Sequence, residues 1–444
     1  MTLLTFLGTG NYDEVKYYYG DKTNYFKSKF IQEALMNIFN ENKMIVFVTP
    51  QAIVNKNFEE LLEKFPNLKA VEIPVPKSEE EFWKLFEIII ESVGEGEEII
   101  FDITHSFRSI PFIGFLIALF LKEVKNVKIK GVYYGAYEPN KEYAPIIDLT
   151  PMINLAEWIY AVKDLKKYGR SDSIKEFLDN SRGKKLGSLL DNISKSIYYN
   201  LCGITISKAY ELNSQKEKLN KILPQIKPME YIKNDIFEFT KFGIKDFVNK
   251  SDNSIKAKLN IEILEKLFEL AKYQKEKQLI PQFFQSIREW LIDMLIYEVG
   301  KDNEYFLNTW VDENTRKFIE YILYNISINK DKSESKIVKI IENSLNNDEK
   351  ENKEIEEYLK ELKENNIEIK DVVSKLKNTI DNFKEEKIDI IKLLNDIRNI
   401  RNPISHAGRK KSVSYKKLDK IENLANNILK ECEKILSYIK TVEK

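Results

Sequence analysis

Histidine is rare in this sequence, so each copy can be examined as an acid–base group. The 444 residues contain two, His105 and His406, and histidine is the side chain whose ordinary pKa lies closest to neutral pH. His406 follows Arg401 and Asn402 after a spacer of three residues. Arginine can hold a phosphodiester with two hydrogen bonds, while histidine can take up or release a proton. This pairing suits metal-independent RNA cleavage, in which a ribose 2′-hydroxyl attacks the adjacent phosphate.

The segment before His406 has the pattern of an amphipathic helix. Its apolar positions recur every three or four residues, at Ile388, Ile391, Leu394, Ile397 and Ile400. Pro403 lacks a backbone donor and disfavours helical geometry at Asn402, which predicts a break with Asn402 as N-cap and Pro403 opening a new turn. Such a bend would place Arg401 beside His406. A surface helix end whose cations offset the helix dipole also fits the arginines, but the rare histidine favours a functional site.

The predicted chemistry needs more acid–base groups than one chain supplies near Arg401. Attack by a 2′-hydroxyl needs one group that takes a proton and another that gives one. His105 lies in a different predicted domain, so His406 is alone. Two chains related by a two-fold axis would bring two copies of His406 together. We therefore expect a homodimer, or an oligomer built from dimers, with a composite site.

Charge is balanced over the whole chain but concentrated locally. Lys+Arg and Asp+Glu number 70 each, whereas residues 1–150 carry 16 basic and 22 acidic side chains. Four cations flank the His406 motif and are expected to bind RNA phosphates; they are Arg398, Arg409, Lys410 and Lys411. The segment 398–411 contains no carboxylate, the usual ligand of hard cations such as Mg²⁺. We expect neither a metal site nor a cofactor.

The other histidine stands in a polar loop between an apolar strand and a buried helix. The strand ends near residue 103 and the helix begins near Pro111, with Thr104, His105, Ser106 and Arg108 between them. Hydroxyls, an imidazole and a guanidinium just before a helix N-terminus suit a phosphate or a nucleotide. The same residues could instead tie the loop to neighbouring carbonyls.

A glycine-containing turn follows the first apolar strand, which covers residues 3–7. Gly8 and Gly10 would let the backbone approach a ligand, and Thr9 and Asn11 offer a hydroxyl and an amide. The run lacks the spacing of a dinucleotide fingerprint or a Walker loop. A plain strand-to-helix turn is an equally good interpretation.

The elements around these two loops alternate between strand and helix. Expected strands cover 3–7, 44–48, 70–73, 98–103 and 127–134, and expected helices cover 29–39, 58–65, 82–92 and 110–122. This alternation predicts a Rossmann-like parallel sheet with helices on both faces. Such sheets bind ligands beyond the carboxyl ends of their strands, where both polar loops would lie.

After about residue 150 the periodicity is helical almost throughout. The expected organisation is a ligand-sensing domain over 1–155, a helical linker or dimerisation region over 156–275, and a helical domain over 276–444. The segment 346–366 is rich in Glu, Lys and Asn and reads as a solvated helix or a mobile insertion. Cys432 falls on the apolar stripe of the last helix and is expected in the core, as is Cys202.

Composition excludes several classes of protein. Two cysteines rule out a disulfide scaffold and a cysteine-rich zinc site. The longest apolar run, residues 110–121, is shorter than the roughly 17–25 residues that a membrane-spanning helix needs. The opening residues lack the basic leader of a signal peptide. We expect a soluble cytoplasmic protein with no membrane partner.

Two of these motifs resemble a known family. The Gly8–Gly10 turn and the run from Asp102 to Pro111 resemble the CARF (CRISPR-associated Rossmann fold) domains of type III CRISPR accessory proteins. The Arg401-Asn402…His406 spacing resembles the HEPN ribonuclease signature. Their order along the chain is similar to that of the CARF–HEPN ribonucleases, over residues 1–150 and about 275–444. Ser106, where glycine is frequent, and Pro403 depart from the usual pattern.

The resemblance implies a single-stranded RNA endoribonuclease in antiviral defence, allosterically activated by a cyclic oligoadenylate, with cyclic tetra-adenylate the expected ring. It implies that Gly8 to Asn11, Thr104 to Ser106 and Arg108 contact the ring, and that Arg401, Asn402 and His406 are catalytic. Whether Thr9, His105 and Ser106 also cut the ring stays open. Two alternatives remain: a HEPN-type toxin ribonuclease, or a non-catalytic nucleotide-sensing regulator.

Overall fold

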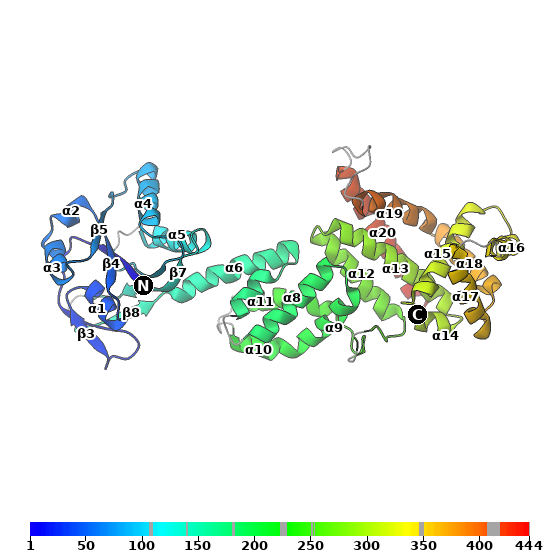
Figure 1. Ribbon diagram of the computed structural model, residues 1–444, viewed down its shortest axis with the longest axis horizontal. Coiled ribbons are helices and arrows are strands. Elements are labelled where there is room, and N and C mark those ends of the chain that lie inside the picture. Colours follow the sequence, from blue (N-terminus) through cyan, green and yellow to red (C-terminus); the bar gives the residue numbers. More distant parts are fainter. Residues whose placement is uncertain are drawn as a thin grey trace. The chain divides into compact units, whose positions relative to one another are not determined.

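A computed structural model describes residues 1–105, 110–138, 141–179, 183–222, 229–249, 252, 254–345, 350–405 and 418–443. The chain divides into two compact units, Met1–Ile159 and Tyr160–Lys444 (Figure 1). The first unit contains the whole β-sheet and the second is helical. The fold class predicted from the sequence, a Rossmann-like sheet followed by a helical region, is confirmed. No helix in the described ranges combines the length and the apolar character that crossing a membrane requires.

The sheet of the first unit has eight strands in the order β3-β2-β8-β7-β6-β1-β4-β5. The strands are β1 (Thr2–Leu7), β2 (Val15–Tyr18), β3 (Tyr25–Ser28), β4 (Lys43–Val48), β5 (Lys69–Glu72), β6 (Glu98–Asp102), β7 (Lys128–Gly135) and β8 (Tyr143–Asp148). β1 runs parallel to both β4 and β6, as the alternating elements predicted. The strand order reverses at β1, so its carboxyl end borders a crevice of the kind that binds ligands.

The sheet is mixed rather than purely parallel, which corrects the sequence-based expectation. β2 pairs antiparallel with β3, and β7 pairs antiparallel with β8. β2, β3 and β8 were not predicted. β2 and β3 have four residues each, too short for an alternating pattern to stand out among the polar residues around them.

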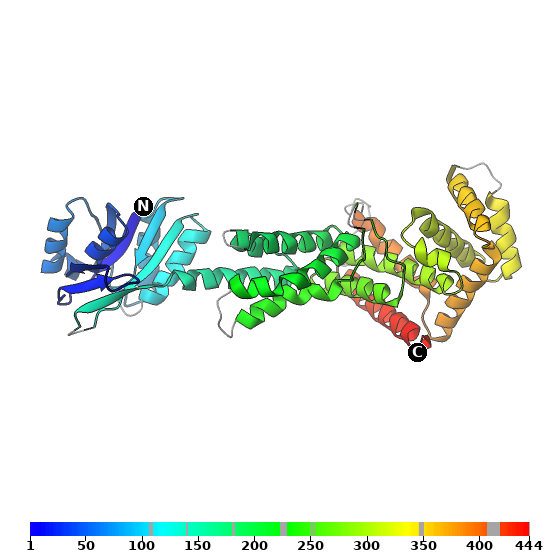
Figure 2. The ribbon, with the colours of Figure 1, turned by 90° about the horizontal axis from the view of Figure 1, so that it is seen from below.

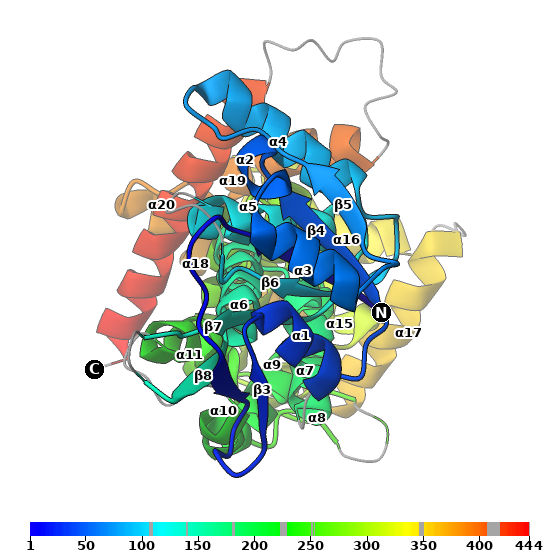
Figure 3. The same cartoon turned by 90° about the vertical axis from the view of Figure 1, so that its left-hand side faces the viewer.

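Helices cover both faces of this sheet (Figure 3). They are α1 (Ile31–Ile38), α2 (Pro50–Ile53), α3 (Lys56–Lys64), α4 (Glu79–Glu91), α5 (Ile110–Glu123) and the beginning of α6 (Thr150–Tyr168). Because side chains alternate along a strand, Leu3 and Leu7 of β1 pack with the core beneath α1 to α3, whereas Leu4 and Phe6 pack with the core beneath α4 and α5.

The second unit consists of helices, with one isolated β-bridge between Val248 and Ile255 in the described ranges. Its α-helices after α6 are α7 (Asp172–Asp179), α8 (Lys184–Tyr198), α9 (Cys202–Leu212), α10 (Lys216–Ile222), α11 (Met229–Phe237), α12 (Ile261–Glu276), α13 (Ile280–Gly300), α14 (Glu304–Asn308), α15 (Glu313–Ile328), α16 (Glu334–Leu345), α17 (Lys350–Glu364), α18 (Ile369–Glu385), α19 (Ile390–Ser405) and α20 (Leu418–Val442). One apolar core extends from Ile206 to Ile439. In Figure 2, α20 (red) lies beside the green helices α12 and α13, against which it packs.

The two cysteines of this unit behave as predicted. Cys432 of α20 is completely buried in the core. Cys202 is half-buried and packs against the same core. Burial raises the pKa of Cys202 to about 11, so its thiol stays protonated at neutral pH and is a poor nucleophile.

The described part of the segment 346–366 is mainly a helix, which was one of the two alternatives predicted from its composition. Residues 350–364 form α17, and Tyr358, Leu359 and Leu362 on one side of it are buried. The hydroxyl of Tyr358 lies 2.8 Å from Thr315 Oγ1 of α15. The alternative of a mobile insertion is therefore wrong for α17, because three apolar residues at helical spacing are enough to dock it.

The predicted helix break before Pro403 is absent. α19 continues through this proline and ends at Ser405. The proline removes the hydrogen bond that a backbone N–H would donate to the carbonyl four residues earlier, and this loss falls within the last turn of the helix. Burial of Ile390, Ile391 and Ile397 against the core holds the rest of the helix.

Candidate functional site

The loop that carries His105 is anchored to three strands at once. Asp102, the last residue of β6, is fully buried and accepts hydrogen bonds from Thr5 Oγ1 at 2.6 Å and from Thr104 N at 3.0 Å. The hydroxyl of Thr104 also donates to Asp102, and it accepts a hydrogen bond of 2.8 Å from Gly135 N. Burial raises the pKa of Asp102 to about 6, against the opposing effect of these hydrogen bonds. Thr104 is thus a structural anchor whose hydroxyl is already engaged.

His105 comes next and lies over the Gly8 turn. Its ring stacks on Tyr12 with the centroids 4.3 Å apart. The hydroxyl of Tyr12 accepts a hydrogen bond of 2.8 Å from Gly8 N, and a Cβ at Gly8 would lie only 3.0 Å from that oxygen. His105 Nε2 is buried, and no hydrogen-bond partner for it occurs among the described residues. A buried polar atom without a partner is costly, so this nitrogen needs a partner that the described residues do not supply.

The turn that contains Thr9 and Gly10 is held in place by two asparagines at the beginning of α3. Asn57 donates to the carbonyl of Gly10 at 2.8 Å, and Asn55, the N-cap of α3, donates to the carbonyl of Thr9 at 3.4 Å. These bonds leave the side chains of Thr9 and Asn11 exposed. The structure therefore brings Gly8, Thr9 and His105 together at the carboxyl edge of β1, as predicted.

A cavity of about 430 Å³ opens at this edge and extends along the ends of β4 and β5. Apolar side chains form part of its wall, and polar groups line the rest; the lining includes Phe6, Phe47, Ile73, Val75, Thr9, Thr49, Gln51, Lys77 and His105. Sequence reasoning missed Tyr12, Thr49, Gln51 and Lys77. The carboxyl ends of parallel strands lie at one edge of the sheet. The residues that follow the second and third predicted strands could therefore have been predicted to line the same cavity.

Burial also lowers the pKa of His105 to about 4, from an ordinary value of 6.5. Between pH 6.5 and about 4, His105 is therefore protonated in the unfolded chain but neutral in the folded chain. This difference favours the unfolded state, so the free energy of unfolding should decrease as the pH falls through this range. His105→Phe keeps an aromatic ring for Tyr12 but cannot titrate. We expect its melting temperature to fall less than that of the wild type over this range, and parallel curves would contradict the assignment.

The second candidate site lies on α19. Arg401 is half-exposed, and Arg398 is exposed one turn earlier, so both side chains lie on the same side of the helix. Ser106, Arg108, His406, Arg409, Lys410 and Lys411 fall outside the described residues, as does the side chain of Asn402. The pairing of Arg401 with His406 therefore stays a prediction from the sequence.

A partly buried ion-pair network lies between α13 and α15. Arg316 of α15 pairs with the buried Asp293 and, at 2.5 Å, with Glu289, both on α13. Burial raises the pKa of Asp293 to about 6, and the charge of Arg316 opposes that rise. Arg288 joins the network through Glu289 at 2.5 Å and Glu320 at 2.7 Å. Sequence reasoning missed this network, although Glu289 and Asp293 stand four residues apart on a largely apolar helix.

Comparisons with known proteins match both units. Residues 2–139 match the family model of the CARF domain of the CRISPR system endoribonuclease Csx1, and residues 154–251 match that of the second domain of the CRISPR-associated protein MJ1674. The MJ1674 protein of Methanocaldococcus jannaschii is 30% identical over 275 residues, which cover 59% of this chain and 38% of that relative. The match thus spans well under half of the relative's length.

Among solved structures, Enterococcus italicus Csm6 bound to cyclic hexa-2′-fluoro-hexa-dAMP is similar over 98% of this chain and 93% of that chain, with 9% identity and a TM-score of 0.45. A TM-score of 0.45 at 9% identity is too low to support an argument about function. The resemblance of the first unit to CARF domains is confirmed by the family match over residues 2–139. Both family matches end by residue 251, so the nuclease motif stays a prediction.

Proposed function

We propose that this chain, which is similar over residues 2–139 to the CARF domain of a CRISPR system endoribonuclease, is a single-stranded RNA endoribonuclease switched on by a cyclic oligoadenylate. The observation that supports ring sensing is the crevice at the end of β1, where Gly8 and Thr9 meet His105, whose Nε2 has no hydrogen-bond partner in the part of the chain that the structure describes. The nuclease half is supported by the Arg401, Asn402 and His406 motif.

In this proposal the cavity at the sheet edge receives part of the ring. Val75 is half-buried and offers apolar surface to an adenine base, above the buried side chains of Phe47 and Ile73. Lys77 and the predicted contact Arg108 supply positive charge for phosphates. Neutral His105 offers Nε2 as a hydrogen-bonding group rather than as a cation, because its pKa is held at about 4 by burial. An even-membered ring can share the two-fold axis of a homodimer and so contact two such edges.

At the nuclease site, one His406 takes the proton of the ribose 2′-hydroxyl, and the oxygen forms a bond to the adjacent phosphorus. The bond from phosphorus to the 5′-oxygen breaks, and the partner's His406 gives that oxygen a proton. Arg401 offsets the charge that develops on the phosphate. The products are a 2′,3′-cyclic phosphate and a 5′-hydroxyl end. Asn402 is assigned to the same site, and Arg409, Lys410 and Lys411 attract the RNA backbone.

Activation then requires coupling between two distinct sites. The ring must bind more tightly to the arrangement of the dimer in which the two nuclease motifs face one another. Purified full-length protein tests the proposal directly: single-stranded RNA should be cut when cyclic tetra-adenylate is present and should stay intact when it is absent. Ring-independent cutting would instead favour the toxin alternative, and a regulator would cut under neither condition.

Arg108→Ala should weaken activation without changing the nuclease. Loss of one charged hydrogen bond to a phosphate should shift the half-activating concentration of cyclic tetra-adenylate by about tenfold to a hundredfold. Saturating ring should restore most of the cleavage rate. Isothermal titration measures the affinity directly, and an unchanged dissociation constant would make Arg108 a loop anchor only.

A further inference from the structure

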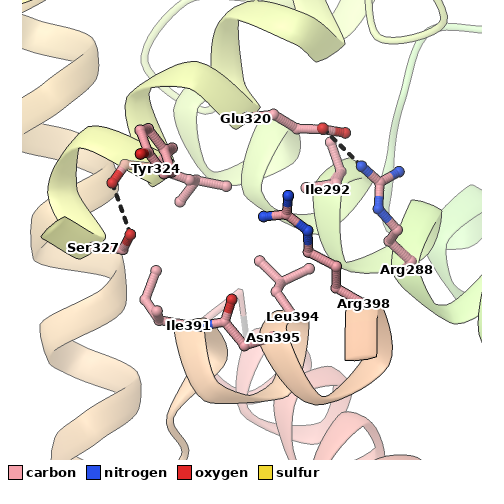
Figure 4. Close-up of a pocket in the computed structure, with 10 residues that line it drawn as sticks. Arg288, Ile292, Glu320, Tyr324, Ser327, Ile391, Leu394, Asn395 and Arg398 are labelled. Atoms are coloured by element: carbon pink, nitrogen blue, oxygen red, sulfur yellow. Dashed lines mark hydrogen bonds and ion pairs between the residues drawn. The ribbon is translucent and has the colours of Figure 1, made fainter. Parts of the chain in front are cut away.

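A small cavity lies between α13, α15 and α19, on the side of α19 from which Arg398 projects (Figure 4). Its volume is about 130 Å³. Ile292 and Leu323 contribute buried apolar surface from two of the helices, and Ile391 does so from the third. Polar groups surround this floor. An apolar floor with a few convergent polar groups is the usual composition of a ligand site, but the volume is below the roughly 300–1,000 Å³ of a whole ligand pocket, so a nucleotide would fill the cavity only in part and would lie mainly on its rim.

The two arginines of the cavity differ in their partners. Arg288 is held by Glu320 at 2.7 Å and by Glu289 at 2.5 Å, which leaves the Glu320 carboxylate neutralised. Arg398 is exposed, and no ion-pair partner for it occurs within the described ranges. In Figure 4 its guanidinium points into the cavity from α19. A planar fork of donors without a partner matches a phosphate group.

Other groups around the cavity, on α15 and on α19 itself, suit a nucleobase. Tyr324 of α15 is 57% exposed and can present a ring face for stacking. Asn395 of α19 is exposed and carries both a donor and an acceptor. Ser327 donates to the carbonyl of Tyr324 at 2.7 Å, so its hydroxyl oxygen is left as an acceptor.

Arg398 also has a defined relation to the predicted catalytic arginine. It precedes Arg401 by three residues on one continuous helix, which places the two side chains about one turn, or roughly 5 Å, apart along the axis. An extended RNA strand that presents its scissile phosphate to Arg401 can therefore present a neighbouring phosphate to Arg398.

We propose that this cavity is the subsite for the nucleotide next to the scissile phosphate, with Arg398 on its phosphate and Tyr324 stacked on its base. This inference rests on the proposed ribonuclease function. Asn395 faces the edge of the base and contributes to base preference. The ion pairs of Arg316 with Glu289 and Asp293 join α15 to α13 and so hold together two of the helices that form the cavity.

The test measures binding separately from cleavage. The probe is a short fluorescein-labelled single-stranded RNA made uncleavable by 2′-O-methyl groups, titrated with full-length protein and cyclic tetra-adenylate and followed by anisotropy. Arg398→Ala should raise the dissociation constant about tenfold, and Tyr324→Ala should do the same, whereas Tyr324→Phe stays within about twofold of the wild type. Lys392→Ala, which removes a cation from α19 outside the cavity, is the matched control.

Steady-state kinetics on cleavable RNA should show the same changes in KM, with kcat within about twofold of the wild type. Unchanged binding by Arg398→Ala and Tyr324→Ala, in variants whose melting curves match the wild type, would overturn the subsite. A wild-type chain that binds RNA but does not cut it would overturn the proposed nuclease, and the anisotropy series would still decide this inference. A chain that binds no RNA would overturn both.

Discussion

Arg401→Ala and His406→Ala should each lower RNA cleavage by about a hundredfold or more, while cyclic tetra-adenylate still binds. Loss of a proton-transfer group typically costs about 10²- to 10⁴-fold in rate, and loss of Arg401 removes the charge that stabilises the transition state. Arg401 is half-exposed, so its removal should cost chemistry rather than core packing. Gel-based single-turnover cleavage assays measure the rate, and isothermal titration measures ring binding.

Two controls accompany this prediction: a variant that loses a different cation of α19, and dimers that combine one variant chain with one wild-type chain. Lys392→Ala on the same helix should keep near-normal turnover. Dimers that contain one His406→Ala chain should be strongly impaired if the two chains share a site. Near-normal turnover by purified His406→Ala would remove His406 from the mechanism.

A single 2′-deoxyribose at the scissile position should block cleavage there completely, because the attacking hydroxyl is missing. The reaction should proceed in EDTA and leave a 2′,3′-cyclic phosphate on the upstream fragment. The segment 398–411 holds cations, one imidazole and amides but no carboxylate, so the phosphate charge is offset by arginine rather than by a hard cation.

Mass spectrometry of the products measures this outcome. The matched control is a deoxyribose one nucleotide away from the scissile position, which should leave cleavage nearly unchanged. A 3′-hydroxyl end, or activity that EDTA abolishes and Mg²⁺ restores, would mean that another mechanism operates.

Much of the first unit could be predicted from the sequence because its parallel strands are buried. Expected strand 44–48 is observed as β4, Lys43–Val48, and expected helix 110–122 as α5, Ile110–Glu123. These segments are long apolar runs with clear ends. β2 and β3 were missed because they are short strands that carry many polar and tyrosine side chains, and their place in the sheet depends on pairing with the distant β8.

The candidate site was predicted in part for the same reason. Gly8, Thr9 and His105 were found because each follows an obvious strand. The stacking of Tyr12 on His105 was not visible, since it depends on how one loop folds over another. The role of Thr104 as an anchor between Asp102 and Gly135 depends on hydrogen bonds across three strands. At Pro403, a local rule predicted a break that the packing of α19 overrides.

The central claim, a ribonuclease controlled by a cyclic oligoadenylate, is tested most directly by one cleavage measurement. Purified full-length protein is incubated with single-stranded RNA in EDTA, with and without cyclic tetra-adenylate, and the rate of cutting is compared. We expect rapid cleavage with the ring and little or none without it. Equal rates in the two reactions, or no cleavage in either one at saturating ring, would contradict it.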